Sequence, residues 1–258
     1  MNLRPAYPAL ADRETDATTC AWTWPPEIVR LQPGAIDLWL IDLDAPPRDA
    51  EQVLDAPERE RAGRFRRAID ARRFVLGRAA LRRVLAQYVG GDAASLPLAV
   101  DGHGKPTLIR GPAFNLSHSG TRALLAVCGS ATVGVDIERV RPMETAVELA
   151  ERFFAPGEAA TIAAAPSMRR DSVFFRCWTR KEAVLKALGE GLQRDTASID
   201  AGFGATERVV ALPGAPRLVV RSFTPEPGWE GAVCVASDAP EPALRLRCFD
   251  TAVFDTVD

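Results

Sequence analysis

Two carboxylates alternate with apolar residues near the middle of the chain. Asp136 and Glu138 lie in the segment VGVDIE, at residues 133–138. Side chains two residues apart in a strand point to the same face, so these two carboxylates would project together. Adjacent negative charges repel unless a cation lies between them, and oxygen ligands suit Mg²⁺. The pair therefore indicates a magnesium site, although a solvent-facing acidic strand end is the commoner meaning of such a pair on its own.

A glutamate and a lysine one helical turn apart form the second candidate. Glu182 and Lys186 lie in the segment WTRKEAVLK, at residues 178–186. On its own this segment is typical of an amphipathic helix with an ordinary surface ion pair. The chain has 32 lysines and arginines, of which only Lys105, Lys181 and Lys186 are lysines. Because lysine is a compact, mobile point charge and arginine a flat fork, these three positions are candidates for a role specific to lysine.

Small hydrogen-bonding residues and a histidine follow an expected strand at residues 113–116. Ser117 and His118 lie in the segment FNLSHSG, at residues 114–120. This composition suits a phosphate or nucleotide cradle; a polar turn is the simpler alternative. A Ser–His nucleophilic pair is a third possibility, but adjacent residues do not normally align for proton transfer and no third triad member is evident.

Two further features fit phosphate binding less specifically. The loop GHGKP at residues 102–106 has glycines that let the backbone approach a ligand closely. Arginines crowd residues 59–83, and such a positive surface suits phosphates or an acidic partner. RNA binding is the rival interpretation, but no interleaved aromatic residues support it. A solvated helix face accounts for most of these arginines.

The composition is that of a globular protein and excludes several classes. The chain has 258 residues, is 47% hydrophobic and 26% charged, and carries a net charge of −2, which favours neither nucleic acid nor a membrane surface as partner. Five cysteines occur without a CxxC pair, which argues against zinc and for reduced thiols. No signal-peptide pattern or apolar run of about 20 residues appears. We expect a cytoplasmic protein.

Strands and helices are expected in both halves of the chain. A proline-rich stretch, residues 1–34, reads as an extended surface arm. A helical pattern runs from Pro57 to Tyr88 with a possible break near Gly63, and residues 145–188 are largely helical with breaks at prolines. Alternating apolar segments indicate strands at 36–43, 113–116, 122–128, 132–138, 208–212, 217–223, 231–236 and 244–249. The pattern predicts an α+β fold.

The order of the candidate segments resembles one family. GKP (104–106), FNLSHSG (114–120), GVDIE (134–138), and WTRKEAVLK (178–186) followed by GEGL occur in this order. They resemble the successive signatures of 4′-phosphopantetheinyl transferases, and the resemblance covers roughly residues 36–236. The length of the chain, together with Trp178 and the KEA motif at residues 181–183, resembles the large, Sfp-type branch of the family, which has a broad range.

The resemblance implies a fold and a division of the chain. Sfp-type enzymes are monomers with a pseudo-twofold arrangement of two similar α/β subdomains, each a long helix packed on a small, mostly antiparallel sheet. The expected parts are an N-terminal arm (1–34), an N-terminal subdomain that binds coenzyme A (35–130) and a C-terminal subdomain that binds metal and catalyses (131–258). The active site would lie in the cleft between the subdomains.

The resemblance also implies an activity. The enzymes transfer the 4′-phosphopantetheine moiety of coenzyme A to a serine of an acyl, peptidyl or polyketide carrier protein and release 3′,5′-ADP. Asp136, Glu138 and Glu182 would hold Mg²⁺ against the pyrophosphate. Glu182 would also take the proton from the carrier serine, directly or through water. Lys186 would bind the α-phosphate and stabilise the developing charge.

Coenzyme A contacts are implied for residues of the first half and for Lys186. His118 and Arg73 would contact the 3′-phosphate, and Ser117 the pyrophosphate. Gly104, Lys105 and Pro106 would line the adenine end.

One position departs from the family pattern. The family often has a lysine where this chain has Ala68, and Arg66 or Arg67 is the candidate to replace it. Two other functions remain open at this point: a non-catalytic regulator that binds coenzyme A, and a serine hydrolase built around Ser117. Retention of both Glu182 and Lys186 argues against a mere binder.

Overall fold

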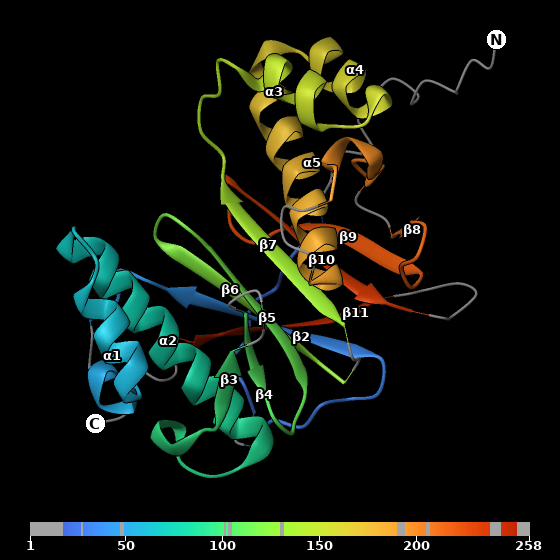
Figure 1. Ribbon diagram of the computed structural model, residues 1–258. Coiled ribbons are helices and arrows are strands. Elements are labelled where there is room, and N and C mark those ends of the chain that lie inside the picture. The colour runs from blue at the N-terminus through green and yellow to red at the C-terminus, as the bar shows by residue number, and fades with distance from the viewer. Residues whose placement is uncertain are drawn as a thin grey trace. The chain divides into compact units, whose positions relative to one another are not determined.

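The structure, a computed structural model, describes residues 18–26, 28–46, 49–100, 102, 105–129, 132–189, 194–204, 207–237 and 244–251. The chain divides into two compact units (Figure 1). Unit 1 comprises Met1–Cys20 and Thr132–Leu244, and unit 2 comprises Ala21–Ala131 and Arg245–Asp258. The expected α+β fold is confirmed, since both units combine helices with sheets. No helix in the described ranges is long and apolar enough to cross a membrane.

Unit 2 contains a four-stranded sheet in the order β11-β2-β6-β5. Its strands are β2 (Ala35–Asp42), β5 (Ala113–Ser119), β6 (Arg122–Cys128) and β11 (Arg245–Asp250). β6 runs antiparallel to both β2 and β5, whereas β11 runs parallel to β2. A separate antiparallel pair consists of β3 (Leu98–Val100) and β4 (Pro106–Leu108).

The helices of unit 2 begin and end where the sequence provides signals. They are η1 (Ala50–Val53), α1 (Ala56–Gly63), the 22-residue α2 (Ala68–Val89) and η2 (Ala93–Ser95). Asp55 and Glu58 form a reciprocal capping box at the start of α1, and Gly90, with φ 78°, ends α2. The possible break near Gly63 is confirmed.

The core of unit 2 joins α2 to the sheet. Leu81 and Leu85 of α2 are fully buried with Trp39 of β2 and Leu125 of β6. Arg82, on the same helix, is also buried; its Nε donates to Glu58 Oε2 at 2.6 Å and its Nη1 to the carbonyl of Leu96 at 3.2 Å. This network ties α1 and the chain after α2 to α2.

Unit 1 contains a five-stranded sheet in the order β1-β9-β10-β7, with β8 paired to β9. Its strands are β1 (Thr18–Thr19), β7 (Val133–Arg139), β8 (Arg208–Val210), β9 (Leu218–Thr224) and β10 (Trp229–Ala236). All pairs are antiparallel except β1 with β9.

The helices of unit 1 are α3 (Ala146–Phe153), α4 (Pro156–Ala164), the 22-residue α5 (Ser167–Leu188) and η4 (Thr196–Ser198). The expected breaks at prolines are confirmed, since Pro156 begins α4 and Pro166 caps α5. α5 packs along β7, β10 and β9 (Figure 1).

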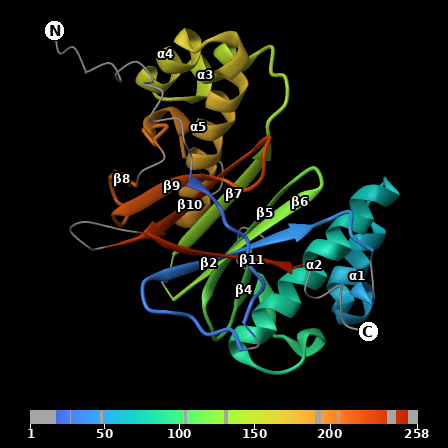
Figure 2. The ribbon, with the colours of Figure 1, turned by 180° about the vertical axis from the view of Figure 1, so that it is seen from behind.

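The last strand differs from the sequence-based expectation. Residues 244–249 were expected to belong with the second half, but β11 pairs with β2 of unit 2, as Figure 2 shows from behind. The buried carboxylate of Asp37 on β2 accepts hydrogen bonds from Arg247 Nε, at 2.6 Å, and from the Tyr88 hydroxyl, at 2.7 Å. A buried carboxylate needs such partners, so Arg247 helps to hold β11 beside β2.

The expected N-terminal arm is only partly described. Residues 1–17 lie outside the described ranges. Thr18 and Thr19 pair with Phe223 and Thr224 of β9, and Thr23 pairs with Phe249 of β11. The described residues of this stretch therefore form short backbone pairings with β9 and β11.

Gly134 lets β7 approach α5 closely. A Cβ added at this residue would lie 2.0 Å from the carbonyl oxygen of Ala183 and 2.4 Å from the amide nitrogen of Ala187. Both obstacles are helix backbone, so a larger residue would force the strand and the helix apart.

We expect Gly134→Ala to lower the free energy of unfolding by about 3 kcal/mol or more, the upper end for overpacking, because the blocking atoms cannot rotate away. Urea unfolding measures this change. The matched control is Gly129→Ala, where an added Cβ meets nothing within 4 Å and the expected change is at most about 1 kcal/mol. Equal stability of the two variants would contradict the close approach.

Candidate active site

The α5-facing side of β7 carries Asp136 and Glu138. Gly134 points at the α5 backbone, and residues two apart on a strand share a face. The sheet register agrees, because Asp136 lies opposite Ala232 of β10, which packs with Ala183 and other residues of α5. The two carboxylates, which were expected to share a face of the strand, therefore lie on the face that is turned toward α5.

Lys186 of α5 contacts Asp136 directly. Its Nζ donates to Asp136 Oδ1 at 2.6 Å. Asp136 is 4% exposed, whereas the Lys186 side chain retains 28% of its exposure. A short charge-assisted hydrogen bond of this kind compensates the desolvation of the carboxylate.

Glu182 lies one helical turn before Lys186 and is half-buried. Burial raises the pKa of its carboxyl, and the negative charges of Asp136 and Glu138 raise it further, while Lys186 acts in the opposite direction. These interactions place three carboxylates and one ammonium in the same electrostatic environment. A carboxylate with a raised pKa is a better proton acceptor than an ordinary glutamate.

A further acidic residue borders this group. Glu230 of β10 lies opposite Glu138, so the two side chains share a face. Glu230 is buried and bonds Ser172 at 2.6 Å and Arg176 at 3.0 and 3.1 Å, both on α5. Glu138 itself contacts Arg141 at 3.2 Å. The charge of Glu230 is thus balanced within the fold.

Mg²⁺ is the cation that the sequence predicts for these carboxylates. Among the described residues no group of three or more His, Cys, Asp or Glu is arranged as a ready metal cage. Mg²⁺ in phosphate-transfer sites is usually bound by one or two carboxylates together with substrate phosphates and water. The carboxylates of Asp136, Glu138 and Glu182 fit that smaller requirement, since their charges act on one another.

Ser117 and His118 lie inside β5. From the sequence, they were expected just after a strand that ended at residue 116. The strand continues to Ser119, and Gly120, with φ 49°, makes the turn into β6. Ser117 is buried and His118 is exposed, as alternation along a strand requires. Because the two side chains point to opposite faces, they are not arranged as a nucleophilic pair.

The other candidates for coenzyme A binding also lie in unit 2. Arg73, on α2, donates to the carboxylate of Asp44 at 3.1 Å from Nε. Lys105 and Pro106 lie at the start of β4, which packs against β5. Gly104 lies outside the described residues. The structure therefore brings together the four charged candidates of unit 1 and distributes those of unit 2 over α2, β4 and β5.

Several structurally important residues of unit 1 were not among those predicted from the sequence. Gly134 is one, although a glycine inside a strand is a known sign of close backbone approach. Glu158 is another: it is buried and bonds Lys181 at 2.7 Å, and nothing in its own segment indicates this partner. Arg180 is a third; it is fully buried, donates to Ala201 O at 2.7 Å, and has its pKa lowered by burial to about 10.

Comparison with known proteins identifies the family. Residues 48–130 match the model of the 4′-phosphopantetheinyl transferase N-terminal domain, and residues 132–224 match that of the 4′-phosphopantetheinyl transferase superfamily.

Three curated relatives agree. The 4′-phosphopantetheinyl transferase HetI of Nostoc sp. is 35% identical over 85% of this chain and 96% of its own. The 4′-phosphopantetheinyl transferase psf-1 of Bacillus pumilus is 33% identical over 80% and 90%. The 4′-phosphopantetheinyl transferase Sfp of Bacillus subtilis is 31% identical over 72% and 84%. With relatives of this similarity along most of its length, this chain belongs to the 4′-phosphopantetheinyl transferase superfamily, in agreement with the resemblance of its four ordered sequence segments.

Proposed function

We propose that this protein transfers the 4′-phosphopantetheine moiety of coenzyme A to a serine of an acyl, peptidyl or polyketide carrier protein and releases 3′,5′-ADP. The observation that carries the proposal is the group formed by Lys186, Asp136 and Glu182 in a member of this superfamily. It combines an ammonium for phosphate with carboxylates for a cation and a proton. No observation favours a regulator without activity.

Asp136, Glu138 and Glu182 would hold Mg²⁺, because the two strand carboxylates share a face of β7 and their charges act on Glu182 of α5. The bound cation would neutralise charge on the pyrophosphate of coenzyme A. Such transfers depend on positioning and charge stabilisation more than on covalent chemistry, and a few fixed charges can supply both.

Glu182 would accept the proton of the carrier serine hydroxyl, directly or through a water molecule. The serine oxygen then forms a bond to the β-phosphorus, and the bond from that phosphorus to the oxygen of 3′,5′-ADP breaks. Lys186 would stabilise the charge that develops on the departing phosphate. The partial exposure of its side chain supports this role, because a wholly buried lysine could not reach a ligand.

Residues of unit 2 would bind the rest of coenzyme A. Arg73 and His118 are proposed to contact the 3′-phosphate, Ser117 the pyrophosphate, and residues 104–106 the adenine end. The exposure of His118 supports its proposed contact with the 3′-phosphate. Arg73 has a carboxylate partner, Asp44, so we propose that phosphate binding shares or replaces that contact.

The proposal also covers the localisation, the oligomeric state and the subdomains of the protein. The protein would act as a cytoplasmic monomer, with coenzyme A bound by the subdomain of residues 35–130. Metal binding and catalysis would lie in the second half of the chain without its last strand, β11, which pairs with β2 of unit 2. A pseudo-twofold relation between the subdomains is supported by their plan, since each unit taken separately has a 22-residue helix and a mostly antiparallel sheet.

The first prediction concerns the reaction itself. We expect apo-carrier proteins incubated with coenzyme A, Mg²⁺ and this protein to gain the mass of one phosphopantetheine group, because the site joins phosphate-binding and proton-accepting groups. Intact-mass spectrometry over a panel of carriers measures the gain. A carrier whose acceptor serine is replaced by alanine is the control. Confirmed coenzyme A binding without transfer to any carrier would instead favour a regulator.

The second prediction concerns the metal. We expect excess EDTA to abolish transfer and Asp136→Ala to reduce it by at least about a hundredfold, as loss of a charge-stabilising group at a reaction centre does. Asp200→Ala is the matched control in unit 1, because Asp200 forms an exposed ion pair with Arg208 at 2.6 Å, a kind that contributes little. Normal rates in EDTA would exclude the metal role.

The third prediction separates chemistry from binding on α5. Glu182→Gln keeps the side-chain shape but removes its charge, so transfer should slow by at least about a hundredfold, the low end for general-base catalysis. Coenzyme A affinity, measured by calorimetry at saturating Mg²⁺, should change far less. Lys186→Arg should also slow transfer, because a planar fork does not replace a point charge, and the combined variant should be far from additive.

The control for this prediction is Glu151→Gln, which changes an exposed glutamate of α3 and should leave transfer unchanged. If Glu182 and Lys186 were only an exposed helix pair, worth about 0.3–0.5 kcal/mol, both site variants would behave like this control. A wild-type single-turnover rate for Glu182→Gln would end the proposed mechanism.

A further inference from the structure

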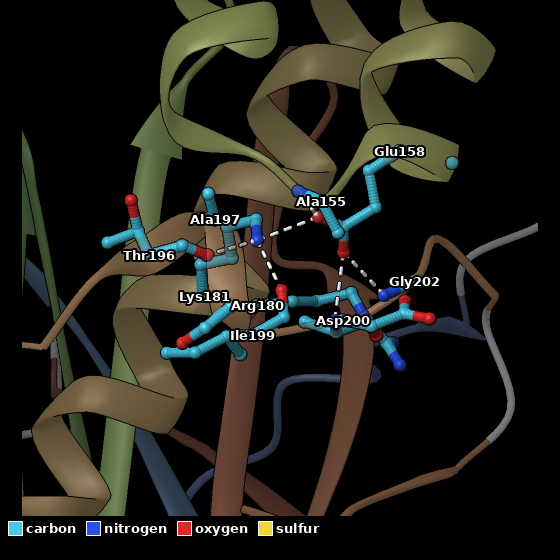
Figure 3. Close-up of polar contacts among 12 residues, drawn as sticks. Ala155, Glu158, Arg180, Lys181, Thr196, Ala197, Ile199, Asp200 and Gly202 are labelled. Carbon is cyan, nitrogen blue, oxygen red and sulfur yellow. Dashed lines mark hydrogen bonds and ion pairs between the residues drawn. The ribbon is translucent and has the colours of Figure 1, made fainter.

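Lys181 forms a wholly buried ion pair with Glu158. The two residues are 1% and 0% exposed, and Lys181 Nζ lies 2.7 Å from Glu158 Oε2. The same Nζ donates to the carbonyl oxygen of Thr196 at 2.8 Å and to that of Ile199 (Figure 3). An ammonium has three protons to donate, and the three acceptors use all of them.

Glu158 is equally well satisfied. Its Oε1 accepts from the backbone amides of Ala201 and Gly202 at 2.8 and 2.9 Å, and its Oε2 accepts from that of Ala155 at 3.0 Å (Figure 3). The ion pair therefore joins three parts of unit 1: the start of α4, residues 196–202, and α5.

The burial of Lys181 excludes a role for its ammonium as a phosphate ligand. A lysine that binds coenzyme A must reach the surface of the protein. The Lys186 side chain is 28% exposed, whereas the Lys181 side chain is 2% exposed. Arginine would not replace it well, because a planar fork does not place its donors toward three oxygens around one point. This explains why a chain that otherwise prefers arginine has a lysine here.

The position of Lys181 on α5 gives the ion pair its consequence. Successive residues of a helix are about 100° apart, so Lys181 lies about 160° around the helix from Ala183. Ala183 is the residue that Gly134 of β7 approaches. The helix is thus held on nearly opposite sides, by β7 and by Glu158, and Glu182 lies between the two contacts.

A buried ion pair is seldom retained for stability alone, because its desolvation can cancel its attraction. This pair holds α5 from the side opposite its sheet, next to the carboxylate of Glu182. Its effect would therefore be on the position of the helix and not on stability. Residues that orient a metal-binding or catalytic side chain typically change activity by about 10- to 100-fold when they are replaced.

We propose that Lys181 is a positioning residue, which together with Glu158 fixes the rotation of α5 and thereby the places of Glu182 and Lys186. The inference rests on the proposed transferase function. Lys181 does not touch the substrate or the cation; it acts through the helix that carries the residues which do.

The test compares Lys181→Met with a matched break of a buried ion pair in the other unit. We expect kcat per folded molecule to fall by about 10- to 100-fold in Lys181→Met. The Kd for coenzyme A should change much less, because the proposed contacts of unit 2 remain and only that of Lys186 is disturbed. Arg82→Met, which removes the buried partner of Glu58, should lose stability but keep its kcat per folded molecule.

Two further variants remove the dependence on a single substitution. Glu158→Gln keeps the shape of the side chain and should lower kcat in the same way, so it replaces Lys181→Met if that variant does not fold. The double variant should be no slower than the worse single variant, because both substitutions break one interaction.

A readout independent of activity is amide hydrogen exchange in residues 182–188. We expect faster exchange there in Lys181→Met and in Glu158→Gln, but not in Arg82→Met. Unchanged exchange together with an unchanged kcat per folded molecule would overturn the inference. A Kd for coenzyme A raised at least about tenfold with kcat retained would also overturn it, because Lys181 would then be a ligand. If the wild-type protein transfers nothing to any carrier, the proposed function fails, and exchange in residues 182–188 alone decides whether the pair positions the helix.

Discussion

The close approach of β7 to α5 at Gly134 is the constraint on which the candidate site depends. A side chain at this position would overlap the backbone of Ala183 and Ala187, so the strand and the helix can meet at this distance only without a Cβ. The alternation of the strand then places Asp136 and Glu138 on the side of the helix, and the turn of α5 at the contact carries Glu182 and Lys186. One missing side chain thus sets the spacing of four charged ones.

The electrostatics of this group follow from that spacing. Three carboxylates act on one another in a partly buried environment, and the pKa of Glu182 is raised by burial and by its acidic neighbours. Lys186 offsets part of the negative charge through Asp136, while Glu230 is balanced separately by Arg176. The negative charge of the three carboxylates is the basis on which a Mg²⁺ site is proposed. Burial, together with the charges of Asp136 and Glu138, gives the carboxylate of Glu182 its raised affinity for a proton.

Burial separates the charged residues of unit 1 into two kinds. Lys181, Glu158 and Arg180 are fully buried and bonded to backbone groups or to one another, so they fix the chain and cannot reach a ligand. Glu182 and Lys186 keep part of their surface. Lys181 and Glu182 are neighbours in sequence but differ in burial. Lys181 is enclosed by the protein and is proposed to orient the helix, whereas Glu182 is partly exposed and is proposed to act in the reaction. Arg82 of unit 2 is likewise fully buried.

The sequence by itself determined the family and the local geometry. Four ordered segments predicted the superfamily that the comparisons then showed, the strand period predicted that Asp136 and Glu138 share a face, and Gly63, Pro156 and Pro166 marked helix boundaries. Only the tertiary structure decided which elements meet. It placed β11 beside β2, extended β5 through Ser117 and His118, and paired Lys181 with Glu158. The physical reason is that periodicity fixes the face on which a side chain lies, through contacts between near neighbours in the chain. What that face packs against depends on contacts between residues far apart in sequence, such as Arg247 with Asp37 or Gly134 with Ala183, and no local pattern encodes them.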